Sequence, residues 1–369
     1  MPRSGAQHRV LKHEWGSVAV RMRRMTLHRR VLLQQAAAIG TVAAVGGSGW
    51  AANNTGSDMT GAFGTGEIDR QLPAGDEIFL DHVGHFVRDP AAAGAALALA
   101  GFAPTPVSIQ VNPDPAGGPA KLTGTGNVTA MLRRGYMEVL FKTADTPLGR
   151  ELDAALARYG GVHLAAFSVA DAAKAGARLA AEGFRTRPVV EMERPVETAT
   201  GPGKAAFTVA RVEPDAMAEG RIQILTHRTE DAVWQQRWLD HPNTALALLD
   251  IVFAVADIEE AAQRFARFTG RKPVAGGGGI AVPLDRGRVM LVTAPTLAGL
   301  LPGLIPPSLP FAPCYGVAVG ALDTAAASLR AGNVAAERRG GYLVAPFPAA
   351  LGAGAWVFVE RAGDLPWRG

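Results

Sequence analysis

Apolar and polar residues follow one pattern four times along the chain. In the first copy, a strand-like segment at about 79–87 precedes an alanine- and leucine-rich stretch with helical character, which stops at Gly101, and three more strand-like segments follow. Segments of the same kind open three further copies, at about 162–169, 249–255 and 314–319. A fixed order that recurs in this way indicates one supersecondary unit used repeatedly. The pattern therefore predicts an α+β fold of four βαβββ modules.

The later strands of the first two copies complete this assignment. In copy one they are expected at about 107–111, 127–133 and 136–141, and in copy two at about 189–192, 206–212 and 221–225. A single βαβββ unit cannot cover both faces of its curved sheet, so the units are expected to pair and to leave a cleft between them, where small ligands usually bind. The resulting domains are 77–229 and 247–361, with linkers at 53–76 and 230–246 and a tail at 362–369.

The first 52 residues have the order of a signal peptide: basic residues, then an apolar stretch, then small residues. The pair Arg29-Arg30 before Val31-Leu32-Leu33 resembles a twin-arginine export signal, although the usual aromatic residue is missing. The apolar stretch is shorter than the roughly 20 residues of a membrane span, so no stable span is expected. Residues 1–52 are predicted to be a signal peptide, and the protein to be periplasmic or extracellular. The alternative is a cytoplasmic protein whose translation starts at Met25 or Met59.

The net charge of +4 originates in the leader, because the first 58 residues hold eight Lys and Arg against two acidic residues. The rest of the chain has 29 basic against 31 acidic residues and carries −2. Phosphate binding needs a basic surface, so no nucleic-acid partner is expected. Cys314 is the only cysteine, which excludes an intramolecular disulfide and a thiolate zinc cluster. We expect it to be a buried small hydrophobic residue.

Several short segments appear in a characteristic order within and after the first two copies. They are Gly124-Thr125-Gly126-Asn127, Tyr136-Met137-Glu138-Val139-Leu140, Gly161-Val162-His163, Thr226-His227-Arg228-Thr229 and His241-Pro242-Asn243. With the repeats, this order resembles the glyoxalase-like branch of the vicinal-oxygen-chelate superfamily, which includes glyoxalases, bleomycin-resistance proteins and dioxygenases. The resemblance covers about residues 77–361 and is strongest in 78–255. It implies two curved-sheet domains, each made of two modules.

The resemblance also implies a divalent metal ion, held by side chains from the first and last strands of two paired modules. Carried over, the ligands are His82, Glu138, His163 and Gln223. Imidazole and carboxylate ligands leave open positions for two adjacent substrate oxygens, which the metal polarises. Gln223 departs from the pattern, because an amide oxygen coordinates metal more weakly than a carboxylate. His227 lies four residues later on the same strand face and is an alternative ligand.

The register of the second copy is a further departure. Aligning Asp89 with Asp171 places His82 opposite Leu164 rather than His163, and a slip of one residue turns a side chain to the other face. A β-bulge at Gly160-Gly161 is the alternative that restores His163 to the site.

Other polar residues are assigned to the same cleft. Glu138 or His227 is expected to act as the catalytic base. Asn127, Thr129 and Arg133 alternate on one strand face and are expected to line the substrate pocket, where Arg133 would hold an anionic oxygen. A solvated strand face is the alternative for these three residues.

Copies three and four lack the expected ligands. Asp250 and Met290 stand where copy one has its histidine and glutamate, and Pro313 and Phe358 stand near these positions in copy four. These copies are expected to complete the fold or to form a homodimer. The resemblance implies a metal-dependent lyase, isomerase or dioxygenase that acts on a small oxygenated substrate. The alternatives are a metal-free protein that binds an aromatic or antibiotic molecule in the same cleft, and a structural module.

Overall fold

The computed structural model describes residues 70–114 and 116–368, and over this range the predicted α+β fold of four βαβββ units is confirmed. Unit one contains β1 (Ile78–Phe86), α1 (Pro90–Leu99), β2 (Ser108–Asn112), β3 (Lys121–Met131) and β4 (Tyr136–Lys142). Unit two contains β5 (Gly161–Val169), α3 (Ala172–Ala181), β6 (Val190–Thr198), β7 (Gly201–Arg211) and β8 (Arg221–His227). The predicted signal peptide, and the linker 53–76 up to residue 69, lie outside the described residues.

The last two units have shorter strands. Unit three contains β9 (Ala245–Ala254), α5 (Ile258–Thr269), β10 (Val274–Gly276), β11 (Gly279–Pro283) and β12 (Arg288–Val292). Unit four contains β13 (Phe311–Val319), α7 (Leu322–Ala331), β14 (Glu337–Arg339), β15 (Tyr342–Pro346) and β16 (Ala355–Val359). Additional helices lie between or after the strands: α2 (Pro147–Arg158), α4 (Glu230–Val233), α6 (Ala294–Leu300) and the 3-10 turns η1 (Pro214–Ala216), η2 (Gln236–Trp238), η3 (Ala349–Leu351) and η4 (Ala362–Asp364).

Aspartate caps fix where the helices of the first three units begin. Asp89 accepts hydrogen bonds from the backbone N–H groups of the first turn of α1, and Asp171 and Asp257 do the same for α3 and α5. An N-terminal cap of this kind contributes about 1 kcal/mol to helix stability. Because the cap follows the opening strand at the same place in each unit, it also sets the register between the units.

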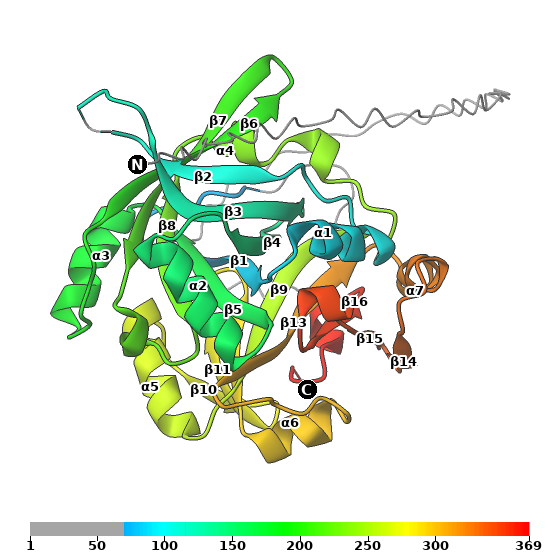
Figure 1. Cartoon of the computed structure of the whole chain (residues 1–369). Coiled ribbons are helices and arrows are strands. Elements are labelled where there is room, and N and C mark those ends of the chain that lie inside the picture. Colours follow the sequence, from blue (N-terminus) through cyan, green and yellow to red (C-terminus); the bar gives the residue numbers. More distant parts are fainter. Residues whose placement is uncertain (1–69, 115, 369) are drawn as a thin grey trace, which may run out of the picture. The chain divides into compact units, whose positions relative to one another are not determined.

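The first two units close into a barrel. The strands pair in the order β1-β4-β3-β2-β6-β7-β8-β5, and β1 also pairs with β5, which completes the ring. Units three and four form a second sheet from β9 to β16, joined to the first through β5 and β13. In Figure 1, β1, β5, β9 and β13 lie near the middle of the strands, while α3 and α5 lie outside them and α2 is drawn in front of them.

The strands bury apolar residues on both faces. One face packs against α1, α3, α5 and α7, and on the other face Phe86, Leu140, Leu164 and Val209 form a separate apolar cluster with two leucines of α2. The described residues include no helix long and apolar enough to cross a membrane. Cys314 is buried, as expected.

The inner face of the second sheet is filled by the end of the chain. Trp367 is 1% exposed and packs in the apolar cluster of this face with Leu365. Its indole Nε1 donates a hydrogen bond of 2.9 Å to Asp250, and Arg368 donates to both carboxylate oxygens of Asp250 at 2.8 and 2.5 Å. The segment predicted as a tail is therefore part of the core.

Candidate functional site

Strand pairing shows which residues of the four units occupy equivalent positions. In unit one, Glu138 lies opposite Gly84, two residues after His82. In each unit, the residue of the last strand pairs with the residue two positions after its counterpart on the opening strand. The equivalent pairs are Leu164 and Gln223 in unit two, Asp250 and Met290 in unit three, and Cys314 and Val357 in unit four. The unit-four pair is one residue away from the expected Pro313 and Phe358.

His82 and Glu138 meet in a small inner cavity of the barrel, of about 40 Å³. His82 Nε2 lies 3.6 Å from Glu138 Oε2, and both residues are buried. Glu138 Oε1 accepts a hydrogen bond of 2.6 Å from Asn127 Nδ2 and a longer one of 3.3 Å from Gln110. The ring of Tyr136 stacks on His82 with centroids 4.4 Å apart. The pairing of His82 with Glu138 that the sequence suggested is thus present.

Asp81 connects two histidines behind this pair. It is skipped by the pairing of β1 with β5, which makes it a β-bulge, and its carboxylate accepts from His82 Nδ1 at 2.7 Å and from His227 Nε2 at 2.9 Å. Burial alone would raise the pKa of Asp81, but the charges and hydrogen bonds of His227 and His82 hold it well below its usual range. His227 Nε2 is therefore engaged by Asp81, while its ring packs against Trp234 and Phe207.

His163 does not join the group. Leu164 pairs with Gly84 and Val162 with His85, so His163 bulges out of the ladder. Its Nε2 donates 2.8 Å to the carbonyl of Tyr159, its ring stacks on Tyr159, and it lines a separate cavity beside Phe86. Leu164 lines the inner cavity instead. The expected ligand His163 is therefore corrected: the bulge shifts it out of the position equivalent to His82, which Leu164 holds.

The fourth expected ligand is placed in the inner cavity but is already bonded. Gln223 lines the cavity, and its Oε1 accepts a hydrogen bond of 2.9 Å from Arg211 Nε. Within residues 70–114 and 116–368, no three His, Cys, Asp or Glu side chains come together in a way that could hold a metal ion. The four positions that the resemblance implies hold one imidazole, one carboxylate, one amide and one leucine. These residues do not fit the expected metal site.

The three residues that were expected to line one substrate pocket lie in three different places. Asn127 lines the inner cavity, and Thr129 lines a larger neighbouring cavity. Arg133 lies beyond the end of β3, where its Nη2 pairs with Asp240 at 3.2 Å, and it lines neither of these cavities. The expectation for Arg133 is wrong because β3 ends at Met131, which interrupts the alternation on which it was based.

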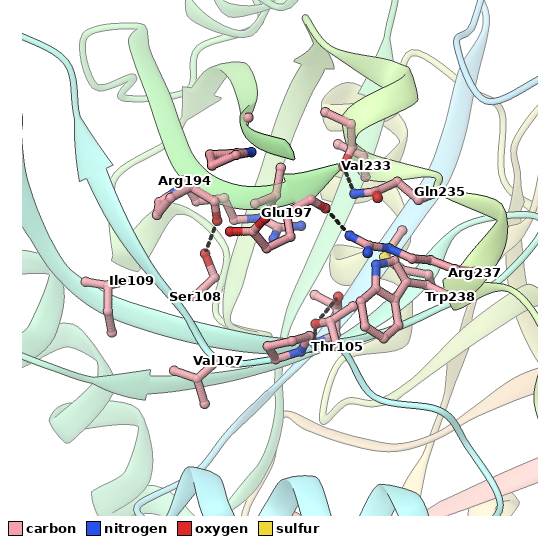
Figure 2. A pocket seen from close by; sticks show the side chains of 18 residues that line it. Thr105, Val107, Ser108, Ile109, Arg194, Glu197, Val233, Gln235, Arg237 and Trp238 are labelled. Carbon is pink, nitrogen blue, oxygen red and sulfur yellow. Dashed lines mark hydrogen bonds between the residues drawn. The ribbon is translucent and has the colours of Figure 1, made fainter. Parts of the chain in front are cut away.

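The larger cavity, here called the outer cavity, has a volume of about 350 Å³ and lies between residues 105–109, 194–197 and 232–238. Figure 2 shows Arg194 and Glu197 on one wall, and Arg237 and Trp238 on the segment that follows β8. This volume lies in the range of sites that hold small organic molecules. Arg194 lines both the outer and the inner cavity and therefore marks where they meet.

Sequence reasoning missed Arg194 and the wall formed by Trp238. Arg194 comes from β6, which runs from Val190 to Thr198 and so extends beyond the expected strand at 189–192. Along β6 the buried residues Met192 and Arg194 alternate with exposed or half-buried ones, so the strand pattern itself was the available signal.

Comparison with known proteins adds family information to this geometry. A family model described as "Glyoxalase-like domain" matches residues 80–269. Comparison with curated proteins finds no significant match.

Solved structures with similar folds were also found. A hypothetical protein from Staphylococcus aureus aligns with a TM-score of 0.52 and 10% identity, over 76% of this chain and 98% of the other. A mutant of 4-hydroxymandelate synthase from Streptomyces coelicolor aligns with a TM-score of 0.49 and 13% identity, over 77% and 93% of the two chains. The Mn(II)-bound glyoxalase from Novosphingobium aromaticivorans aligns with a TM-score of 0.45 and 13% identity, over 78% and 83%.

Proposed function

The chain belongs to the glyoxalase-like domain family, and from this premise we propose that it binds a small organic molecule inside its first barrel without a metal ion. The supporting observation is the composition of the four equivalent positions. Leu164 holds the position in unit two that is equivalent to His82, and the Gln223 oxygen accepts a hydrogen bond from Arg211, so two donors remain where the family pattern implies four. A stable divalent site usually needs at least three protein ligands.

The charges around the inner cavity support the same proposal. Arg194, Arg211 and Arg221 line it together with two carboxylates, those of Glu138 and Glu193. A dication placed between these guanidinium groups would be repelled, and the repulsion is strong in a site with little water. The charge of the residues that line this cavity therefore disfavours a metal ion.

The second candidate is the metal-dependent lyase, isomerase or dioxygenase that the sequence suggested, and one observation favours it. Asp81 accepts from His82 Nδ1, which leaves Nε2 directed toward Glu138. A carboxylate behind a histidine is the arrangement that commonly orients a metal-bound imidazole. In this candidate the ion would be held by His82 and Glu138 alone.

Metal analysis of the full chain decides between the two candidates. The proposal expects no stoichiometric divalent metal after purification, and no binding of Mn²⁺ or Zn²⁺ at micromolar concentration in calorimetric titrations. In a thermal-shift panel of small aromatic acids and amides, at least one compound should raise the unfolding temperature equally before and after EDTA treatment.

Glu138→Gln is the matched variant for this experiment, because it removes the carboxylate donor and keeps the shape of the side chain. Under the proposal, its metal content equals that of the wild type. One metal ion per chain in the wild type, lost in Glu138→Gln, would reject metal-free binding in favour of the second candidate.

A further inference from the structure

Arg194 is a buried cation that has no ionic partner within residues 70–114 and 116–368. Arg194 is 6% exposed. Its side chain donates no hydrogen bond and forms no salt bridge to any other described residue. Burial lowers the pKa of Arg194, and Tyr136 and Glu138 raise it only in part. A guanidinium in water-poor surroundings is costly unless an anion is paired with it. The structure therefore holds an unbalanced positive charge at the boundary of the two cavities.

The other two arginines of the inner cavity are engaged. Arg211 donates to Gln223 and to the sulfur of Met192. Arg221 pairs with Glu151 at 3.4 Å and lies over the ring of Phe86. The charge that a ligand could balance is therefore the single charge of Arg194.

The outer cavity beside Arg194 is suited to an apolar group. Val107, Ile109, Met131 and Val196 contribute apolar walls, and the ring of Trp238 lies on the segment that follows β8. Thr105 and Thr129 bond to each other through their hydroxyl groups, and Ser108 donates to the Pro195 carbonyl, so these hydroxyls are already partnered (Figure 2). The walls thus combine one buried cation, that of Arg194, with mainly apolar contacts, while the other two charged lining residues, Glu197 and Arg237, are exposed.

We propose that the outer cavity binds an organic monocarboxylate, with its carboxylate on Arg194 and its apolar body against Trp238. This inference deepens the proposed function, because it names the chemical class of the ligand for the same barrel. A monocarboxylate matches the one buried positive charge of the outer cavity, and its two oxygens can accept both parallel N–H groups of a guanidinium. The carboxylate of the ligand then serves as the ionic partner of Arg194.

Arg194→Met tests the proposal without knowledge of the natural ligand. Methionine keeps a long side chain and removes the charge, so the ligand-free variant should unfold at a higher temperature than the wild type. A residue that serves the fold alone would give the opposite result. A lower unfolding temperature for Arg194→Met would therefore overturn the proposal.

Binding is measured with 3-phenylpropanoate and its neutral amide, by calorimetry and by tryptophan fluorescence on the full chain. The wild type should bind the carboxylate at least about tenfold more tightly than the amide, and Arg194→Met should lose this preference, because a charged hydrogen bond is removed. Arg133→Met is the matched control, since Arg133 is also buried but lies outside both cavities, and it should keep the preference. Equal affinity of the wild type for both compounds would overturn the inference.

The result is distinguishable from failure of the proposed function. Amide binding without metal, with no preference for the carboxylate, rejects the monocarboxylate and leaves metal-free binding intact. A carboxylate preference that depends on Arg194 in a protein that also holds one metal ion rejects metal-free binding and leaves the inference intact.

Discussion

Acidification is expected to destabilise the protein through His85, which is buried where the two sheets meet. His85 Nδ1 lies 3.0 Å from the carbonyl of Leu351, and its Nε2 lies 2.8 Å from the hydroxyl of Tyr315. The carbonyl can only accept, so Nδ1 carries the proton and Nε2 accepts from the tyrosine. Trp356 Nε1 donates in turn to the same hydroxyl at 2.7 Å. The neutral imidazole therefore satisfies every group in this chain of hydrogen bonds.

The expected magnitude follows from the pKa of His85, which burial lowers from 6.5 to about 4. Above pH 6.5 the histidine is neutral in both the folded and the unfolded chain, so its full contribution to stability is present. As the pH falls from 6.5 to 4, His85 binds a proton in the unfolded chain but stays neutral in the folded chain, so the free energy of unfolding decreases. The loss is about 2 kcal/mol at pH 5 and about 3 kcal/mol at pH 4.

Urea unfolding of the wild type and of His85→Gln, at pH 7, 6 and 5, measures this effect. Burial also lowers the pKa of His163 and His241, which both proteins contain, so the informative quantity is the difference in free energy of unfolding between the two proteins. Between pH 7 and pH 5, the wild type should lose about 2 kcal/mol more of its free energy of unfolding than the variant loses. A difference that stays constant over this range would show that His85 is not held neutral, and would refute the reasoning.

Three further changes test the site and the core. Leu164→His should place a third donor beside His82 and Glu138, so that calorimetry detects zinc binding that the wild type lacks; an unchanged titration would argue against equivalence of these positions. Trp367→Ala should lower the free energy of unfolding in urea by about 3–5 kcal/mol, because the indole is buried in the second sheet, and a loss below about 1 kcal/mol would contradict this packing. Asp81→Asn should cost about 3 kcal/mol at pH 7 and progressively less below about pH 4, where Asp81 takes up a proton in the unfolded wild type but not in the folded one; an equal cost at pH 3 would contradict its depressed pKa.

The repeat made the fold predictable from sequence. The four opening strands were expected at 79–87, 162–169, 249–255 and 314–319, and they begin within about four residues of these positions. Alternating apolar residues give a signal in each copy, and a capping aspartate recurs in the first three copies, so the copies reinforce one another. The strands β10 and β14, each three residues long, carried too little pattern to be recognised.

The site was predicted less well, because it depends on which face of a strand each side chain occupies. His163 and Leu164 are neighbours in sequence, and a single bulge decides which of them enters the barrel. The alignment of Asp89 with Asp171 had pointed to Leu164, so the information was present but balanced against the histidine motif. The outer cavity could not be predicted, because its wall at 232–238 belongs to a segment that the sequence identified only as a linker.

The packing of residues 362–368 against Asp250 has a consequence for binding stoichiometry. Asp250 holds the position in the second sheet that corresponds to His82 in the first, and Arg368 and Trp367 of the same chain donate hydrogen bonds to it. A covalently attached group competes at an effective concentration in the millimolar range or above, so a free molecule at micromolar concentration does not displace it. Although the architecture repeats four times, we therefore expect titration to saturate at one ligand per chain.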